Sequence, residues 1–160
     1  MGLGSNLGDR TSQIARAIED LRDHGVTVEA ASSLYETEPV GEILDQPDFL
    51  NAVVRIRTSL EPERLLDLCK AIEAEHGRVF GGPRHGPRPI DIDLLLLGEV
   101  ELSTERLTLP HPEITSRRFV LVPLLELDPG LRLPDGTELG SALETLEAAQ
   151  RAERVAPPPA

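Results

Sequence analysis

The sequence predicts a single domain that mixes helices and strands. Its 160 residues, 39% of them hydrophobic, suffice for one sizeable core and are too few for two. Apolar residues recur at helical spacing in some stretches and alternate with polar residues in others, without any internal repeat. Glycine and proline separate these stretches densely enough to place most of the boundaries.

The N-terminal half predicts a loop, a helix and two strands. The glycine-bearing stretch GLGSNLGD is predicted as a loop, and an apolar stripe with a stop at Gly25 predicts a helix over about residues 11–23. Alternation predicts strands over residues 26–30 and within FLNAVVRIRT. Between them lies EPVGEILDQPD, residues 38–48, which is long for a turn and is therefore a candidate functional loop.

The rest of the chain is predicted to form three helices, a third strand and a short partner strand. Pro62 suits a first helical turn, and an apolar stripe carries this helix to Gly77. A strand over residues 90–97 turns at Gly98 and Glu99 into a short partner near residues 100–103. RFVLVPLLEL predicts a helix around Pro123, with a buried strand as the alternative. An amphipathic helix over residues 141–154 completes the domain, and residues 155–160 are predicted as a flexible tail.

Composition and charge limit the partners. With 28 acidic and 16 basic residues, the chain is a poor match to nucleic acid or an anionic membrane, and any anion site must be local. Cys69 is the single cysteine, which excludes an intrachain disulfide framework and fits a reducing compartment. The N-terminus lacks signal-peptide features, and no apolar run approaches the roughly 20 residues that a bilayer needs. A soluble, cytoplasmic protein is expected.

Two aspartates stand at the entrance to an apolar strand in RPIDIDLLLLG. Because strand side chains alternate, Asp91 and Asp93 point to one face and Ile92 to the other. Mg²⁺ prefers hard oxygen ligands, so two carboxylates together with substrate phosphates can complete one or two octahedral sites. The alternative interpretation of so short a motif is a solvated strand entrance.

The preceding segment, RVFGGPRHGPRP, favours the metal interpretation. It carries three arginines and no acidic residue in a chain whose net charge is −12. Arginine forks bind phosphate oxygens, and both they and Mg²⁺ stabilise the charge that develops in phosphoryl transfer. Its glycines and prolines predict a lid over a nucleotide. A solubilising surface loop is the alternative for this segment alone.

The histidines divide into two classes. His24 and His76 stand at predicted helix C-termini and are interpreted as structural. His85 and His111 are of more interest. His111 lies between two prolines in TLPHPEITSRRF, with Arg117 and Arg118 close behind, and is a candidate hydrogen-bond donor to a phosphate.

Taken in order, several blocks resemble the 6-hydroxymethyl-7,8-dihydropterin pyrophosphokinase family of folate biosynthesis. These blocks are GSNLGDR, SSLYETEPVG, DQPDFLNAV, EHGRVF, GPRPIDIDLLLLG and ERLTLPHPEITSRRFVLVPLLEL. The resemblance implies a ferredoxin-like α+β fold, an antiparallel sheet flanked by helices, over residues 1–154. It also implies transfer of pyrophosphate from ATP to the pterin hydroxymethyl group. The expected partners are small-molecule substrates, and a monomer is expected rather than a dimer.

The resemblance further implies roles for individual residues. Asp91 and Asp93 would hold two Mg²⁺ ions, and Arg78 and Arg88 would act with them in catalysis. The implied nucleotide-binding residues are Leu66, Lys70, Glu73, Arg78, His85, Arg88, Leu94, Arg106, Thr108, His111 and Arg117. The implied pterin-binding residues are Gly4, Thr37, Glu38, Val40, Phe49, Asn51 and Phe119, with the two phenylalanines on either side of the pterin ring.

The chain departs from the family pattern at several places. His85 stands where many relatives carry tryptophan, and Lys70 where some carry glutamine. Relatives also have several apolar strand residues before the GSN block, where this sequence has only MGL. Either the first strand is shortened or the start is misassigned, and a missing strand would expose a sheet edge.

Two rival functions remain open at this stage. A metal-dependent nucleotidyltransferase also uses a GS turn and a DxD strand, but there the two elements normally lie close together, whereas Ser5 and Asp91 are far apart in this sequence. A non-catalytic ferredoxin-like module would bind a nucleotide or pterin without turnover. Such a module would not need the two aspartates and the arginine-rich segment together.

Overall fold

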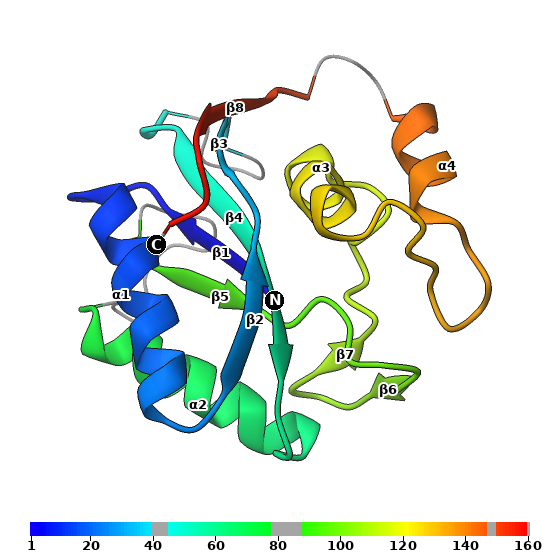
Figure 1. The fold of residues 1–160 in the computed structure, drawn as a ribbon, viewed down its shortest axis with the longest axis horizontal. Coiled ribbons are helices and arrows are strands. Elements are labelled where there is room, and N and C mark those ends of the chain that lie inside the picture. Colours follow the sequence, from blue (N-terminus) through cyan, green and yellow to red (C-terminus); the bar gives the residue numbers. More distant parts are fainter. Residues whose placement is uncertain (40–44, 78–87, 147–149, 160) are drawn as a thin grey trace.

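An antiparallel sheet runs through the computed structural model, which describes residues 1–39, 45–77, 88–146 and 150–159 (Figure 1). Its strands follow the order β5–β1–β4–β3–β8, and β2 also pairs with β4. The bounds are Gly2–Ser5 for β1, Thr27–Ala31 for β2, Leu34–Thr37 for β3, Phe49–Arg57 for β4, Asp91–Asp93 for β5 and Ala152–Ala156 for β8. A separate ribbon pairs β6, Leu102–Ser103, with β7, Thr108–Leu109.

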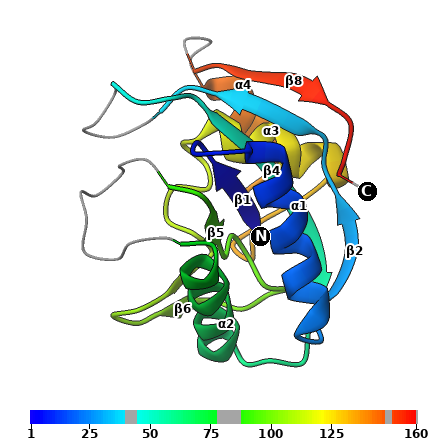
Figure 2. The ribbon, with the colours of Figure 1, turned by 90° about the vertical axis from the view of Figure 1, so that its left-hand side faces the viewer.

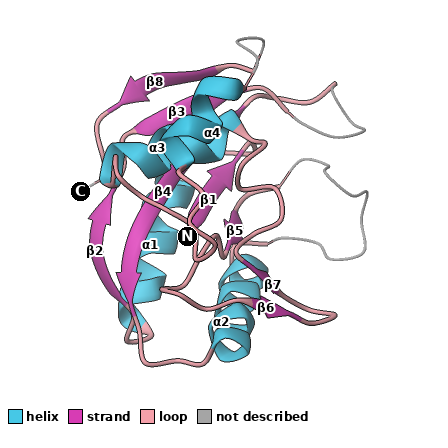
Figure 3. Ribbon diagram, turned by 90° about the vertical axis from the view of Figure 1, so that its right-hand side faces the viewer, coloured by secondary structure: helices cyan, strands magenta, loops and turns pink. Residues whose placement is uncertain are grey.

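Helices cover both faces of this sheet. The helices α1, Arg10–Asp23, and α2, Pro62–Glu75, share one apolar core with the strands (Figure 2). The helices α3, Arg118–Leu127, and α4, Leu139–Thr145, form a second core with Val53 and Leu95 (Figure 3). The predicted α+β class, an antiparallel sheet flanked by helices, is therefore confirmed. No helix in the described part of the chain is both long and apolar enough to span a membrane.

The helices predicted at the start and middle of the chain are confirmed. The Asp9 side chain caps α1 by accepting a hydrogen bond from the Ser12 backbone N–H at 3.1 Å. Pro62 occupies the first turn of α2, where its missing N–H leaves no donor unsatisfied. His24 and His76 are the C-terminal caps of α1 and α2, as their structural interpretation requires. The stretch around Pro123 is helical, as α3.

The first strand corrects the loop predicted at GLGSNLGD. Residues Gly2–Ser5 form β1, which pairs with β4 on one side and β5 on the other. Glycine weakens an isolated strand, so the sequence favoured a loop, but two flanking ladders supply the hydrogen bonds that stabilise it here. The sheet is therefore continuous at this point, without the exposed edge that a missing strand would leave.

The third predicted strand is shorter than expected. Residues 90–97 were predicted, whereas β5 comprises Asp91–Asp93. Its ladder ends where Asp93 pairs with Gly2, because β1 begins there and provides no further partner. The partner predicted near residues 100–103 is β6, which pairs with β7 instead of β5.

The helix predicted over residues 141–154 is wrong in its second half. The helix α4 ends at Thr145, and Ala152–Ala156 form β8 against β3. Alanine, glutamate and arginine favour helix locally, but the open edge of β3 offers a full ladder that local propensity cannot reveal. The strand continues through Val155 and Ala156, which the sequence assigned to the tail. The strand β3 itself was not predicted.

Candidate active site

The candidate metal ligands lie on one face of β5. Asp91 and Asp93 flank Ile92, which is 2% exposed and belongs to the core beneath the sheet. The predicted alternation is confirmed. Gly4 of β1 stands opposite Asp91, and Gly2 stands opposite Asp93. Opposed residues of antiparallel strands share a face, so the carboxylates project beside the part of β1 that carries no side chain.

Negative charge gathers at this pair. Burial raises the pKa of Asp93 to about 7, and the neighbouring Asp91 and Glu73 carboxylates add to the rise. The Arg117 and Arg88 guanidinium groups oppose this rise. Arg88 Nη1 lies 3.4 Å from Asp91 Oδ2. A bound divalent cation would offset the excess negative charge, so the two hard oxygen donors fit Mg²⁺.

The described residues contain no group of three or more His, Cys, Asp or Glu side chains arranged to hold a metal. Asp91 and Asp93 provide two carboxylate donors, and Mg²⁺ in proteins typically takes several of its ligands from water and substrate phosphates.

Glu73 supports β5 from below. Its side chain is fully buried, and its Oε2 accepts a hydrogen bond from the Ile92 backbone N–H at 2.9 Å. Lys70 Nζ lies 3.4 Å from Glu73 Oε1. The structure thus places Glu73 behind the strand that carries the aspartates, and its predicted nucleotide contact stays a prediction.

The candidate pterin residues of the sheet lie side by side on the same face as Asp91. Gly4 pairs with Asn51 of β4, and Thr37 of β3 pairs with Phe49. Asn51 Nδ2 donates to Thr37 Oγ1 at 2.5 Å. A Cβ atom on Gly4 would lie 2.6 Å from Asn51 Oδ1, so only glycine lets the Asn51 side chain lie across β1.

The two candidate aromatic side chains are each paired with an arginine. The guanidinium carbon of Arg88 lies 5.4 Å from the centre of the Phe49 ring. That of Arg117 lies 5.6 Å from the Phe119 ring. Both distances allow cation–π attraction, so the aromatic positions and the phosphate-binding candidates are structurally linked.

His111 follows the cis peptide bond between Leu109 and Pro110. Burial and the nearby Arg117 charge lower its pKa, so the imidazole is neutral at neutral pH. Its Nδ1 accepts a hydrogen bond from the Glu113 backbone N–H at 3.0 Å, which assigns the proton to Nε2. His111 therefore presents an N–H donor, as its predicted phosphate contact requires.

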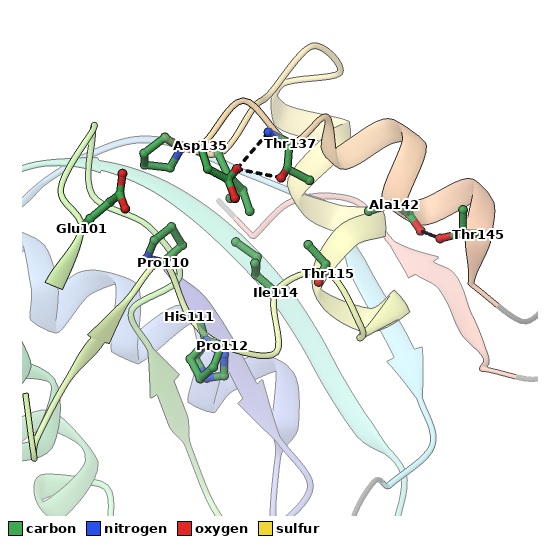
Figure 4. Close-up of a pocket in the computed structure, with 12 residues that line it drawn as sticks. Glu101, Pro110, His111, Pro112, Ile114, Thr115, Asp135, Thr137, Ala142 and Thr145 are labelled. Carbon is green, nitrogen blue, oxygen red and sulfur yellow. Dashed lines mark hydrogen bonds between the residues drawn. The ribbon is translucent and has the colours of Figure 1, made fainter. Parts of the chain in front are cut away.

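His111 also borders an open cavity of about 480 Å³ between the β6–β7 segment and α4 (Figure 4). The cavity is lined by Glu101, Pro110, His111, Pro112, Ile114, Thr115, Leu133, Pro134, Asp135, Thr137, Ala142 and Thr145. Neither aspartate of β5 is among these residues, so this cavity is distinct from the carboxylate pair.

The remaining nucleotide candidates lie on α2, after β5 and on the β6–β7 ribbon. Arg106 pairs with Asp67 and, at 3.7 Å, with Glu63, both on α2. These ion pairs hold the ribbon against the helix that carries Leu66 and Lys70. Leu66 and Leu94 are 9% and 6% exposed and belong to the apolar core, while Thr108 is exposed on β7.

Arg78, Val40 and His85 fall outside the described residues, so their predicted roles stay predictions. Glu38 is exposed immediately after β3. Its predicted pterin contact is likewise still a prediction.

Two residues near the site were missed by the sequence interpretation. Asn6 is 2% exposed; its Nδ2 donates to Gln46 Oε1 at 2.8 Å and to the Pro47 carbonyl at 3.0 Å, and its Oδ1 accepts from the Arg88 N–H at 2.8 Å. Arg10 donates to the Asp48 carbonyl oxygen at 3.1 Å. Asn6 is the asparagine of the GSN block, and its place in that block was the sequence feature that could have indicated it.

The strand pairing also removes one argument against a nucleotidyltransferase. Ser5 and Asp91 are distant in sequence, but Gly4 is the direct β-ladder partner of Asp91. The GS and DxD elements are therefore neighbours in space. Spacing along the chain does not decide between the two functions.

Comparison with known proteins does separate them. The sequence model of the family described as "7,8-dihydro-6-hydroxymethylpterin-pyrophosphokinase (HPPK)" matches residues 1–129. A Methylorubrum extorquens 2-amino-4-hydroxy-6-hydroxymethyldihydropteridine pyrophosphokinase is 47% identical over 148 residues, covering 92% of each chain. The Bacillus subtilis protein of the same name is 48% identical over 128 residues, covering 79% of this chain and 75% of the relative.

Longer plant relatives match as well. An Arabidopsis thaliana "Folate synthesis bifunctional protein" is 46% identical over 127 residues, which cover 79% of this chain and 26% of the relative. The chain thus spans about a quarter of that plant protein and most of the two bacterial ones.

Proposed function

Because the chain belongs to the 7,8-dihydro-6-hydroxymethylpterin-pyrophosphokinase family, we propose that it transfers the pyrophosphoryl group of ATP to 6-hydroxymethyl-7,8-dihydropterin. The products are AMP and the pterin diphosphate, in a step of folate biosynthesis. The observation that carries this proposal is the Asp91 and Asp93 pair, held on a rigid strand beside Arg88 and inside the matched region.

In the proposed reaction, the pterin hydroxymethyl oxygen attacks the β-phosphorus of ATP in line. A new P–O bond forms, the bond from the β-phosphorus to the α–β bridging oxygen breaks, and the hydroxyl proton is released. Arg88 and Arg117 offset the charge that accumulates on the phosphates, and His111 donates its Nε2 proton in a hydrogen bond. Positioning and charge neutralisation supply most of the acceleration.

Asp91 and Asp93 would hold the Mg²⁺ ions. Bound there, Mg²⁺ would neutralise phosphate charge and orient the triphosphate. The family resemblance implies two ions, which oxygens of these two carboxylates and of the substrate phosphates would hold. Arg78, in the segment that precedes β5, is proposed to act with Arg88.

The pterin is proposed to lie between Phe49 and Phe119. Asn51 and Thr37 would read its polar edge, because their amide and hydroxyl groups already share the face that carries Asp91. Gly4 leaves the room that this arrangement needs. Leu66, Leu94, Lys70, Arg106 and Thr108 are proposed to contact the nucleotide from α2 and the ribbon.

The test mixes the protein with ATP, Mg²⁺ and 6-hydroxymethyl-7,8-dihydropterin and separates the nucleotides. AMP that appears only with the pterin, in equal amount to the pterin diphosphate, supports the proposal. ADP as the nucleotide product would show a simple kinase. Binding of both substrates without any product would show a binding module instead.

A further inference from the structure

Two consecutive residues outside the family match, Gln150 and Arg151, contact separate segments that carry candidate pterin residues. They immediately precede β8, which forms the outer edge of the sheet beside β3 (Figure 1). The match ends at residue 129, so the family comparison assigns these two positions no role.

Arg151 joins the ends of two strands. Its backbone N–H donates to Glu38 Oε1 at 3.1 Å, and its guanidinium group forms an ion pair with Asp48. Glu38 directly follows β3, and Asp48 directly precedes β4. The next residues inward, Thr37 and Phe49, are a β-ladder pair and both candidate pterin residues. Arg151 therefore fixes the strand ends immediately beyond that pair.

Gln150 holds the start of α3. Its Oε1 accepts a hydrogen bond from the Arg118 backbone N–H at 2.9 Å, and its Nε2 donates to the Ser116 carbonyl oxygen at 3.2 Å. Arg117, the N-cap residue of α3, makes no side-chain capping hydrogen bond. Gln150 therefore provides the hydrogen-bond acceptor for a backbone N–H of the first turn. This segment carries Arg117 and Phe119.

From these contacts we infer that Gln150 and Arg151 form a C-terminal clasp that sets the spacing between Phe49 on β4 and Phe119 on α3. A planar ring held between two aromatic side chains requires a fixed separation, and the two phenylalanines come from different elements. The clasp residues are positioning residues for the pterin. The inference rests on the proposed function. Gln150 also holds the segment of Arg117, a proposed phosphate contact, whereas Arg151 contacts Glu38 and Asp48 only at the strand ends, so Arg151 is the residue expected to leave ATP binding unchanged.

The expected effect is moderate, because the clasp has support. Arg10 binds the Asp48 carbonyl oxygen at 3.1 Å and Glu36 at 3.0 Å, so the strand ends keep a second attachment when Arg151 is removed. The Arg151 side chain is also 45% exposed, where ion pairs are weak.

The test measures steady-state kinetics of Gln150→Ala, Arg151→Ala and the double variant. Arg154→Ala is the matched control, because Arg154 lies on β8 but donates to Ser33 Oγ at 2.8 Å, away from the clasp. We expect each single variant to raise KM for the pterin about threefold and the double variant about tenfold. The melting temperature of every variant and the KM for ATP of Arg151→Ala should stay at the control values, and Arg151→Lys should keep a pterin KM closer to that of the wild type.

A double variant whose pterin KM equals that of Arg154→Ala would overturn the clasp. So would a parallel rise in KM for ATP in Arg151→Ala, which would show a general loss of structure. If the wild type makes no pterin-dependent AMP, the proposed function fails, and backbone amide exchange decides the clasp separately. The double variant should then speed exchange at Thr37 and at Leu121 together, and unchanged exchange at both would refute it.

Discussion

The two faces of the central strands carry different kinds of residue on the same backbone. One face carries Leu3, Ala52 and Ile92, which are 1%, 1% and 2% exposed in the core beneath the sheet. The other face carries Gly4, Asn51 and Asp91, which pair across the same three strands. Successive residues therefore alternate between the apolar core and the candidate site. The site lies on a rigid support because its immediate sequence neighbours are buried.

The electrostatic contrast between the faces is equally sharp. Each core residue lowers the free energy of the fold by leaving water. Asp93, one residue from Ile92, has a pKa raised to about 7, which shows that its ionised form is disfavoured in the metal-free protein. Ionising Asp93 therefore costs stability, whereas Leu3, Ala52 and Ile92 on the opposite face contribute it.

Replacing an aspartate should give the largest effect, a loss of turnover without a loss of stability. Asp91→Ala removes a proposed metal ligand, and we expect turnover to fall by about a thousandfold, with little change in melting temperature. AMP formation and thermal unfolding measure the two quantities. Asp23→Ala, an exposed position at the end of α1, is the control. Full activity in Asp91→Ala would contradict the proposed metal site.

The neighbouring core residue should show the opposite behaviour. Ile92→Ala leaves a cavity beneath β5, and we expect the free energy of unfolding to fall by about 3 kcal/mol. Denaturant unfolding measures it. The fraction of Ile92→Ala that remains folded should keep its affinity for ATP, which titration calorimetry can measure. A loss of ATP binding without a loss of stability would contradict the assignment of Ile92 to the core alone.

The raised pKa of Asp93 predicts a pH dependence. Between its ordinary value of 3.8 and about 7, the folded protein binds more protons at Asp93 than the unfolded chain does. Protonation of Asp93 therefore stabilises the folded protein in this range, and this stabilisation is lost as the pH rises toward 7. When the pH is raised from 5 to 8 without metal, we expect the free energy of unfolding of Asp93→Asn to rise by about 2 kcal/mol relative to that of the wild type. Denaturant unfolding at the two pH values measures this difference, and a constant difference would refute it.

The smallest of these four effects concerns the glycines of β1. In Gly4→Ala the new Cβ would lie 2.6 Å from Asn51 Oδ1, so we expect KM for the pterin to rise about tenfold. Gly2→Ala is the matched control, because its nearest neighbour is a Leu95 side-chain carbon at 3.7 Å, an ordinary contact. Equal pterin KM values for the two variants would show that Asn51 yields without loss of function.

Local patterns predicted much of this arrangement, and their failures share one cause. The alternation of Asp91, Ile92 and Asp93 and the stripe of α1 depend on neighbours in sequence, and both were predicted correctly. The strand Gly2–Ser5 and the strand Ala152–Ala156 depend on distant partners, and both were assigned to other structures. Only the completed ladder stabilises a glycine-rich or helix-favouring segment as a strand.

The same distinction applies to the site. The carboxylates and arginines were found as residue types in a local stretch, and the family resemblance provided their roles. Asn6 and Arg151 act through partners dozens of residues away, at Gln46 and Arg88 in one case and at Glu38 and Asp48 in the other. No spacing rule along the chain connects such positions.

The pairing of β1 has a consequence for the order of folding. Its Gly4 meets Asn51 on one side and Asp91 on the other, so the strand made first during synthesis waits for two successive partners. Closing such long loops is slow, and the second closure cannot begin before Asp91 has left the ribosome. Until then, β1 has one open edge in the middle of the future sheet. The carboxylate pair is therefore brought beside Gly4 and Asn51 by the most distant strand pairing that β1 makes, and a chain in which this pairing has formed no longer has that open edge.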